Sequence, residues 1–260
     1  MSRVEIRGAQ RSFEGREAVR PIHLDIPAGQ FVSIIGPSAS GKSTLLRMVA
    51  GLLTPTAGSV TLDGEPVETA RRHKRIAVVP QHPALLPWRT VAENARVLLD
   101  VNRRQSHDVR DHGDLLAEVG LAEAADRLPH ELSGGMQQRV ALVRALALGA
   151  PLLLMDEPFA ALDELTRAEM RVLVNRLVEG KGVTTVLVTH SISEAVALSD
   201  RVLVTSYGPA RIIADIAIPL SRPRADAIDD DPSFVSLCAE VRHALHAARL
   251  DEAAPAGSAP

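Results

Sequence analysis

A glycine-rich segment with one lysine is the first part of this chain whose residues could do chemistry. It reads GPSASGKST from Gly36 to Thr44 and fits the pattern G-x-x-x-x-G-K-[ST]. Backbone N–H groups of such a loop surround phosphates, Lys42 neutralises their charge, and Ser43 offers a hydroxyl to Mg²⁺. A buried strand over 31–35 and a helix over 43–49 are expected on either side of it. An ordinary turn rich in glycine and serine is therefore the weaker interpretation.

A second helix start of the same kind lies at LSGGMQQR, from Leu132 to Arg139. Ser133 is a good N-cap, Gly134 and Gly135 follow it, and the spacing predicts an amphipathic helix as far as residue 148. A helix start exposes backbone N–H groups and the positive end of a dipole, which favours an anion. Two such starts are more than one nucleotide requires. We therefore expect the second start of one copy to complete the first site of another.

Polar residues also follow three predicted strands: Asp156 and Glu157 after 152–155, Gln81 after 76–79, and His190 after 183–189. Because ligands gather at the carboxyl ends of parallel strands, we expect these side chains to meet at one γ-phosphate. Asp156 would share Mg²⁺ with Ser43, and Glu157 would orient or deprotonate a water. Gln81 would bind Mg²⁺ or hold that water, and His190 would donate to a phosphate oxygen. The alternatives are a solvated acidic turn and a plain loop histidine.

Strands and helices that alternate along the chain predict an α/β core. A small antiparallel sheet with edge strands is expected near the start, at 4–6, 13 and 22–26, and later strands at 59–62, 202–204 and 212–218. Helices are predicted at 91–101, 111–119, 134–148 and 164–179. A tail from about residue 222 contains a predicted helix at 232–250, and its last residues, 253–260, are predicted to be disordered.

The composition narrows the class of protein. The chain has 260 residues and a net charge of −3, so it has no overall basic field to attract nucleic acid. Its single cysteine, Cys238, excludes an internal disulfide or a multi-cysteine zinc site and suits a reducing compartment. No apolar run is long enough to span a bilayer, and no secretory leader is expected. A role at a membrane would therefore require a partner.

Together these motifs resemble the ATP-binding-cassette (ABC) ATPases over about residues 4–218. Gly36 to Ser43 is similar to Walker A, Gln81 to the Q-loop, 132–139 to the signature, Asp156 to the end of Walker B, 161–163 to the D-loop, and His190 to the switch histidine. The resemblance implies a P-loop NTPase (RecA-like) core with an N-terminal antiparallel β subdomain and a helical signature subdomain. Residues 1–220 would form the nucleotide-binding domain, with about 87–148 as its helical subdomain, and 221–260 a C-terminal extension.

The resemblance also implies a head-to-tail dimer that holds two ATP molecules, each with Mg²⁺. The expected ATP contacts are Phe13, Gly36, Pro37, Ser38, Ala39, Ser40, Gly41, Lys42, Ser43, Thr44 and Asp163, with Ser133, Gly134 and Gly135 contributed by the other copy. Glu157, His190 and Gln81 would be catalytic, and Ser43, Gln81 and Asp156 would hold the metal.

Two positions depart from the family pattern. The aromatic residue near the N-terminus that stacks on adenine is often Tyr, and here only Phe13 is suitably placed. Phe13 can stack but cannot donate a hydrogen bond, and a core phenylalanine is the alternative. Ala39 and Ser40 stand where many importers have Gly and another small residue. A positive φ at Ala39 would be strained.

The segment LLPW, Leu85 to Trp88, is similar to the nitrate/sulfonate/taurine importer ATPases, as are 159–167 and Ser221 to Arg224. In importers this region receives the permease, and an exposed tryptophan is a good contact anchor. The alternative is core packing. The resemblance implies an ATPase subunit on the cytoplasmic face of the bacterial inner membrane, peripheral to it. Its partners would be a permease and a periplasmic or lipid-anchored solute-binding protein, and its cargo a small anion such as a sulfonate, taurine or nitrate.

A non-transport ABC ATPase that acts on nucleic acid or the ribosome is the alternative function. Such chains usually carry a long coiled coil or two cassettes in tandem, and this sequence has neither, so no nucleic-acid partner is expected. A small GTPase would need the base-reading motif N-K-x-D, which is absent from the sequence. An exporter domain would more often be fused to membrane helices.

Overall fold

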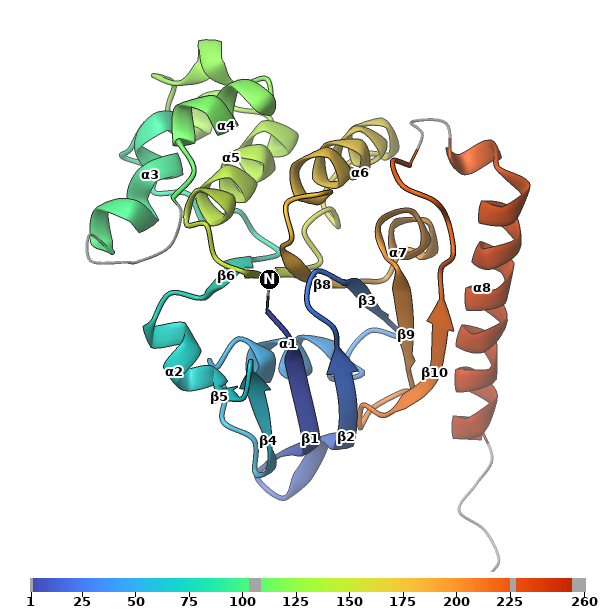
Figure 1. The fold of residues 1–260 in the computed structure, drawn as a ribbon. Coiled ribbons are helices and arrows are strands. Elements are labelled where there is room, and N and C mark those ends of the chain that lie inside the picture. Colours follow the sequence, from blue (N-terminus) through green and yellow to red (C-terminus); the bar gives the residue numbers. More distant parts are fainter. Residues whose placement is uncertain (1, 103–108, 225–227, 254–260) are drawn as a thin grey trace, which may run out of the picture.

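The computed structural model describes residues 2–102, 109–224 and 228–253, which form two sheets with helices packed around them (Figure 1). The larger sheet has the strand order β10-β9-β3-β8-β7-β6. Its strands β3 (Phe31–Ile35), β8 (Thr184–Thr189), β7 (Leu152–Asp156) and β6 (Ile76–Val79) are parallel to one another, with β6 at one edge. This arrangement confirms the predicted α/β fold.

The strands β3, β8 and β7 are buried along almost their whole length because both faces of the sheet are covered. Alternate residues divide between two cores. Leu153, Met155 and Leu187 pack with the helices α3, α5 and α6, whereas Leu152 and Leu154 pack with α1 and the small sheet. The helices concerned are α1 (Lys42–Val49), α3 (Val91–Val101), α5 (Gly134–Ala147) and α6 (Glu164–Val178). The sheet is therefore held rigidly in the middle of the molecule.

The smaller sheet is antiparallel and has the order β2-β1-β4-β5. Its strands are β1 (Val4–Phe13), β2 (Arg16–Ile26), β4 (Ala57–Leu62) and β5 (Glu65–Pro66). The sheet was predicted, but the prediction of an edge strand at 4–6 is wrong. β1 pairs with β2 on one side and with β4 on the other. A short helix, α2 (Val67–Arg72), follows this sheet and was not predicted.

The helical segment between β6 and β7 contains α3, α4 (His112–Glu118) and α5, with 3-10 turns at Ala122–Ala124 and Pro129–Glu131. α5 was predicted to be amphipathic, and this is wrong. It is buried on most of its surface because it packs against α3, α4 and α6 together. Its N-cap is Ser133, as predicted, and the Ser133 Oγ accepts a hydrogen bond from the Met136 N–H at 3.3 Å.

The last third of the chain adds α7 (Ile192–Leu198), β9 (Arg201–Thr205), β10 (Ile212–Ala217), a 3-10 turn (Ile228–Asp230) and α8 (Pro232–Ala253). α8 packs on α7, β9 and β10 around Phe234 and Val241, on the opposite side of the molecule from α3 and α4 (Figure 1). The helix predicted at 232–250 is confirmed, whereas α7 was missed. Residues 254–260 of the end predicted to be disordered lie outside the described residues. No helix in the described part of the chain is long and apolar enough to cross a membrane.

The first turn of α7 contains a buried acidic residue, Glu194, which is only 3% exposed. Its carboxylate accepts a hydrogen bond from the Thr189 hydroxyl and lies 3.5 Å from Nε of Arg167. Its backbone N–H donates to Oγ of Ser191, the N-cap of α7, at 3.3 Å. Burial raises the pKa of Glu194, although the Thr189 hydroxyl and the Arg167 charge oppose the shift. This carboxylate therefore fixes the start of α7 at some electrostatic cost.

The raised pKa of Glu194 predicts a pH-dependent stability. The stabilising contribution of protonated Glu194 is fully present below the ordinary value of 4.5 and is lost as the pH rises through the raised pKa. We therefore expect Glu194→Gln to gain unfolding free energy relative to the unmodified protein as the pH rises from about 5 to about 8. Urea unfolding at several pH values measures this difference. Glu240→Gln, at an exposed position of α8, should show no such trend. A pH-independent difference for Glu194→Gln would contradict the assignment.

Candidate active site

The phosphate-binding loop lies between β3 and α1, and close packing explains two of its glycines. A Cβ on Gly36 would lie 2.0 Å from Oγ1 of Thr205. A Cβ on Gly41, where φ is +100°, would lie 2.4 Å from the Ala18 carbonyl oxygen. Ala39 adopts φ of +59°, the conformation that was expected to strain it. Backbone strain of this kind is characteristic of functional loops.

Lys42 lies inside this loop and is 4% exposed. Its Nζ donates to the carbonyl oxygens of Gly36 at 3.0 Å and Pro37 at 2.6 Å. Burial lowers the pKa of Lys42, while the carboxylates of Glu157 and Asp156 raise it. The ammonium group is thus already removed from water. Its attraction for a phosphate is stronger there than it would be on the surface.

Two pairs of predicted site residues meet at the ends of β7 and β8, of which the pair of Ser43 and Asp156 was expected. Oγ of Ser43 donates to Oδ1 of Asp156 at 2.8 Å. Oε2 of Glu157 lies 3.3 Å from Nδ1 of His190. Glu157 adopts φ of +46°, and its N–H donates to the Val188 carbonyl oxygen at 2.8 Å, which fixes the turn. A second strained residue therefore lies beside the loop.

A cavity of about 440 Å³ opens over the loop. Phe13, Ala39, Lys42, Ser43, Glu157 and Gly208 are among the residues that line it. Its volume is in the range of roughly 300–1,000 Å³ that is usual for small-molecule sites. The Phe13 ring is 44% exposed, and the Arg11 guanidinium lies 4.7 Å from its centroid. The alternative interpretation of Phe13 as a core residue is therefore wrong.

The remaining predicted residues lie apart from this cavity. Gln81 is exposed and does not line it. Ser133 and Gly134 are exposed at the start of α5, and they do not line it either. Asp163 is exposed and caps α6, accepting from the N–H and hydroxyl of Thr166 at 3.0 and 2.7 Å. These hydrogen bonds lower the pKa of Asp163. Within one chain, the structure thus keeps the signature separate from the phosphate-binding loop.

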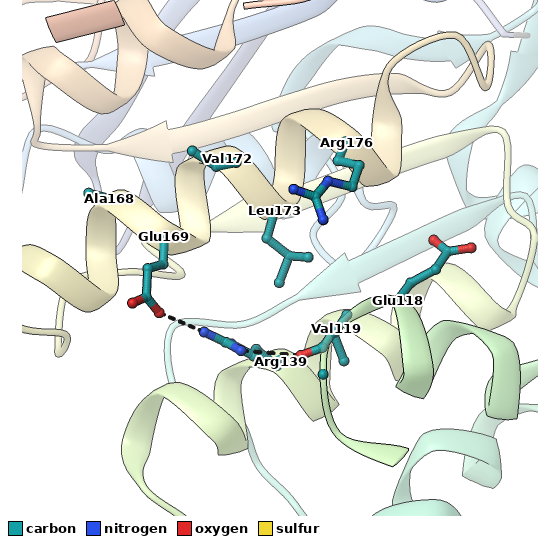
Figure 2. Close-up of a pocket in the computed structure, with 9 residues that line it drawn as sticks. Glu118, Val119, Arg139, Ala168, Glu169, Val172, Leu173 and Arg176 are labelled. Atoms are coloured by element: carbon teal, nitrogen blue, oxygen red, sulfur yellow. Dashed lines mark hydrogen bonds and ion pairs between the residues drawn. The ribbon is translucent and has the colours of Figure 1, made fainter. Parts of the chain in front are cut away.

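Gly135 differs from its neighbour because it is buried against α6. A Cβ there would lie 2.7 Å from Cγ2 of Thr166, so this position has no room for a side chain. The nearby Arg139 reaches from α5 to α6, where it donates to Oε2 of Glu169 at 2.8 Å (Figure 2). It also donates to the Val119 carbonyl oxygen at 3.2 Å. These contacts cross a cleft of about 510 Å³ and join the helical segment to α6.

The LLPW segment forms a loop held from within by Asn94, which is fully buried. The Asn94 amide donates to the carbonyl oxygens of Leu86, Arg89 and Thr90 at 3.1, 2.9 and 3.0 Å. Its Oδ1 accepts from the Leu86 N–H at 2.8 Å. Trp88 is 73% exposed on this rigid loop, so the core-packing interpretation is wrong for the tryptophan. This role of Asn94 was not predicted from the sequence. Its position in a capped helix was the only sequence signal that pointed to it.

Comparisons with known proteins all indicate the same family. The family model described as ABC transporter matches residues 19–160. An aliphatic sulfonates import ATP-binding protein from Mesorhizobium japonicum is 47% identical over 219 residues, which are 84% of this chain and 80% of that protein. One from Cupriavidus necator is 46% identical over 222 residues, 85% of this chain and 71% of that protein.

Solved structures agree with this result. The ATP-binding cassette MJ0796, in a dimeric post-hydrolysis state bound to ADP and Pi, is 32% identical with a TM-score of 0.72. The match covers 84% of this chain and 100% of that one. A second dimeric structure of MJ0796, described as a bacterial ABC transporter cassette, has a TM-score of 0.73 at 31% identity and the same coverage. With this fold, phosphate-binding loop and pair of strand-end carboxylates, the chain belongs to the ABC transporter family and is an ATP-binding ATPase of that family.

Proposed function

We propose that this chain is the ATPase subunit of a bacterial importer for small anions, with aliphatic sulfonates as the first candidates and taurine and nitrate as others of the same class. The observation that carries the ATPase role is the meeting of Lys42, the Ser43–Asp156 pair and the Glu157–His190 pair at one edge of the sheet. The relatives named for sulfonate import support the cargo. We assign residues 1–220 to the nucleotide-binding domain, about 87–148 to its helical subdomain, and 221–260 to an extension.

ATP would bind with its phosphates in the loop of residues 36–44, where backbone N–H groups and Lys42 oppose their charge. Ser43 and Asp156 offer a hydroxyl and a carboxylate, the oxygen ligands that suit Mg²⁺, and Gln81 could add an amide oxygen. Mg²⁺ held there would neutralise charge on the β- and γ-phosphates. Phe13, exposed at the cavity, would stack on the adenine.

Glu157 is the residue proposed to orient and deprotonate the attacking water, because its carboxylate lines the cavity beside Lys42 and Ser43. His190 would donate to a γ-phosphate oxygen. Their contact of 3.3 Å keeps the two side chains at the cavity edge before a nucleotide arrives. The water would lose its proton to Glu157 as it attacks the γ-phosphorus, and ADP would leave.

The signature would act on the ATP of another copy. Gly134 is exposed, and apart from its chain neighbours and the backbone of its own helix no described atom would lie within 4 Å of a Cβ placed there. Ser133 and Gly134 therefore form an open helix start, the kind of surface that accepts a phosphate. Gly135 would belong to the same contact, and Asp163 lies on a neighbouring exposed helix start. The dimeric MJ0796 structures support a homodimer.

Trp88 marks the proposed contact with the permease, because a large exposed aromatic side chain on a rigid loop is a typical interface anchor. The complex would place this chain on the cytoplasmic face of the inner membrane, with a solute-binding protein outside. The solute is read by that protein and by the permease. Measuring which anions the solute-binding protein binds therefore tests the cargo directly.

Glu157→Gln should abolish hydrolysis but preserve ATP binding, because the amide keeps the shape and loses the base. In the permease complex we expect kcat for ATP hydrolysis to fall by roughly 10²- to 10⁴-fold, with sulfonate uptake lost. Equilibrium binding of labelled ATP should be unchanged. Glu123→Gln, at an exposed position of the helical segment, serves as the matched control. Normal uptake by Glu157→Gln would rule out the catalytic role.

Trp88→Ala should weaken permease binding without lowering stability, since the ring is mostly exposed. We expect a loss of at least about 30-fold in affinity if Trp88 is an interface hot spot. Capture from detergent-solubilised membranes with the tagged chain, followed by titration of the purified permease, measures this loss. Leu52→Ala, which removes another exposed apolar side chain, is the control. Capture of nucleic acid or ribosomes in place of a permease would favour the alternative function.

A further inference from the structure

The segment Ser221 to Arg224 has no part in the proposed nucleotide site, yet its second arginine is buried. Arg224 is 8% exposed. Its Nη1 donates to the carbonyl oxygens of Val196 and Ala197 at 3.1 and 2.7 Å, and its Nη2 to that of Ser199 at 2.6 Å. The carbonyls of Val196 and Ala197 belong to the last turn of α7, which a helix end leaves without intrahelical partners, and Ser199 is its C-cap residue. Arg224 thus caps α7 from the C-terminal extension.

Arg222 joins the same helix end to the central sheet. Its Nη2 donates to the Leu198 carbonyl oxygen at 2.8 Å and to Oδ1 of Asp200 at 2.9 Å. The other carboxylate oxygen of Asp200 accepts from the Phe31 N–H at 2.9 Å. Phe31 begins β3, the strand that leads into the phosphate-binding loop. The end of α7 is therefore fixed relative to the strand that leads into the loop of Lys42.

The opposite end of α7 starts directly after the proposed switch residue, His190. The helix has seven residues, so the two ends are only about 10 Å apart at 1.5 Å per residue. At this start, Ser191 and Thr189 hold Glu194, and Arg167 bridges Glu194 to the D-loop by donating to the Leu162 carbonyl oxygen at 2.7 Å. A displacement of the capped end would move a short, stiff helix as one body. The displacement would therefore also shift His190, which directly precedes the start of the helix.

The cap is not the arrangement that stability alone would favour. Burial and, to a smaller extent, the charge of Arg222 lower the pKa of Arg224 to about 10, although the carboxylates of Asp200 and Glu179 oppose the shift. Its Nε is buried with no hydrogen-bond partner among the described residues. Burying a charge and leaving a donor unpaired both cost free energy. What the guanidinium provides in return is a fixed geometry, because its planar fork holds three carbonyls at once.

We propose that Arg224 is a positioning residue for ATP hydrolysis, which sets the place of His190 by capping the far end of α7. This inference rests on the proposed function, since it takes His190 as the group that contacts the γ-phosphate. The C-terminal extension would thus have a role in ATP hydrolysis through Arg224. Arg224 itself does not contact the nucleotide site, so nucleotide binding should be independent of it.

Arg224→Met tests the proposal, because methionine replaces much of the apolar stem and removes the donors. In the permease complex we expect kcat to fall by roughly 10- to 100-fold, as misplacement of a catalytic group does, with KM for ATP within about twofold. Arg242→Met, at an exposed arginine of α8, is the matched control and should leave both constants unchanged. A fall in melting temperature with kcat retained at lower temperature would show a merely structural role and overturn the proposal.

A double-mutant cycle with His190→Ala gives the decisive readout. If Arg224 acts through His190, Arg224→Met should lower kcat in the parent but not further in the His190→Ala background. If the fold-losses in kcat of the two single variants multiply in the double variant, the two residues act independently and the proposal is overturned. Full activity of His190→Ala alone would contradict the proposed function itself, whereas an inactive His190→Ala with a fully active Arg224→Met would overturn only this inference. Should Arg224→Met not fold, Arg224→Lys keeps the charge without the fork, and the same cycle applies with an intermediate kcat expected.

Discussion

The parallel pairing of β3, β8 and β7 is the constraint on which the whole site depends. Ile35 lies opposite Thr189, and Asp156 lies opposite Val188. Because the strands run in the same direction, the residues that follow them emerge at one edge of the sheet. The phosphate-binding loop, His190 and Glu157 are therefore neighbours although they are distant in sequence. A slip of one residue in this pairing would turn alternate side chains to the other face of the sheet and disperse the site.

Three buried charged groups lie on the elements around the site, Lys42 and Glu194 near this edge and Arg224 at the far end of α7, and each is held by polar partners. Lys42 donates to carbonyls of its own loop, Glu194 accepts from a hydroxyl beside His190, and Arg224 donates to the end of α7. Such groups cost desolvation energy and contribute less to stability than apolar packing would. In return, each one fixes a backbone segment in a single place. The geometry of the site is thus set by compensated polar groups on an apolar sheet.

The sequence was most informative where function depends on neighbouring residues. The pattern around Lys42 predicted strand, loop and helix, and the strand ends predicted the meeting of Ser43 with Asp156. What spacing could not predict are roles that come from tertiary packing. An acidic residue in a helix such as Glu194 normally indicates a solvated face, and Arg224 lies in a segment rich in arginine and proline. Only the folded chain shows that both are buried.

Two errors have the same origin. α5 was expected to be amphipathic, but three other helices cover it, and no local pattern reports how many neighbours a helix has. Likewise, an alternating strand such as β1 looks the same at the edge of a sheet and inside one. For LLPW the sequence left exposure and burial both open. Asn94 lies nine residues beyond the start of that motif, and its buried amide holds the backbone of the loop on which Trp88 is exposed.

The two glycines of the signature show why one chain forms only part of the proposed site. Gly135 is explained within the chain, because Thr166 leaves no room for a Cβ. Gly134 is not explained in this way, because a Cβ there would meet no described atom within 4 Å apart from its chain neighbours and its own helix backbone. Glycine is favoured where a backbone must let a ligand approach closely, so its presence at an open helix start needs a reason outside the chain. Close approach of a phosphate bound to another copy supplies that reason. ATP would then stabilise the dimer by binding both surfaces, and its hydrolysis would release them.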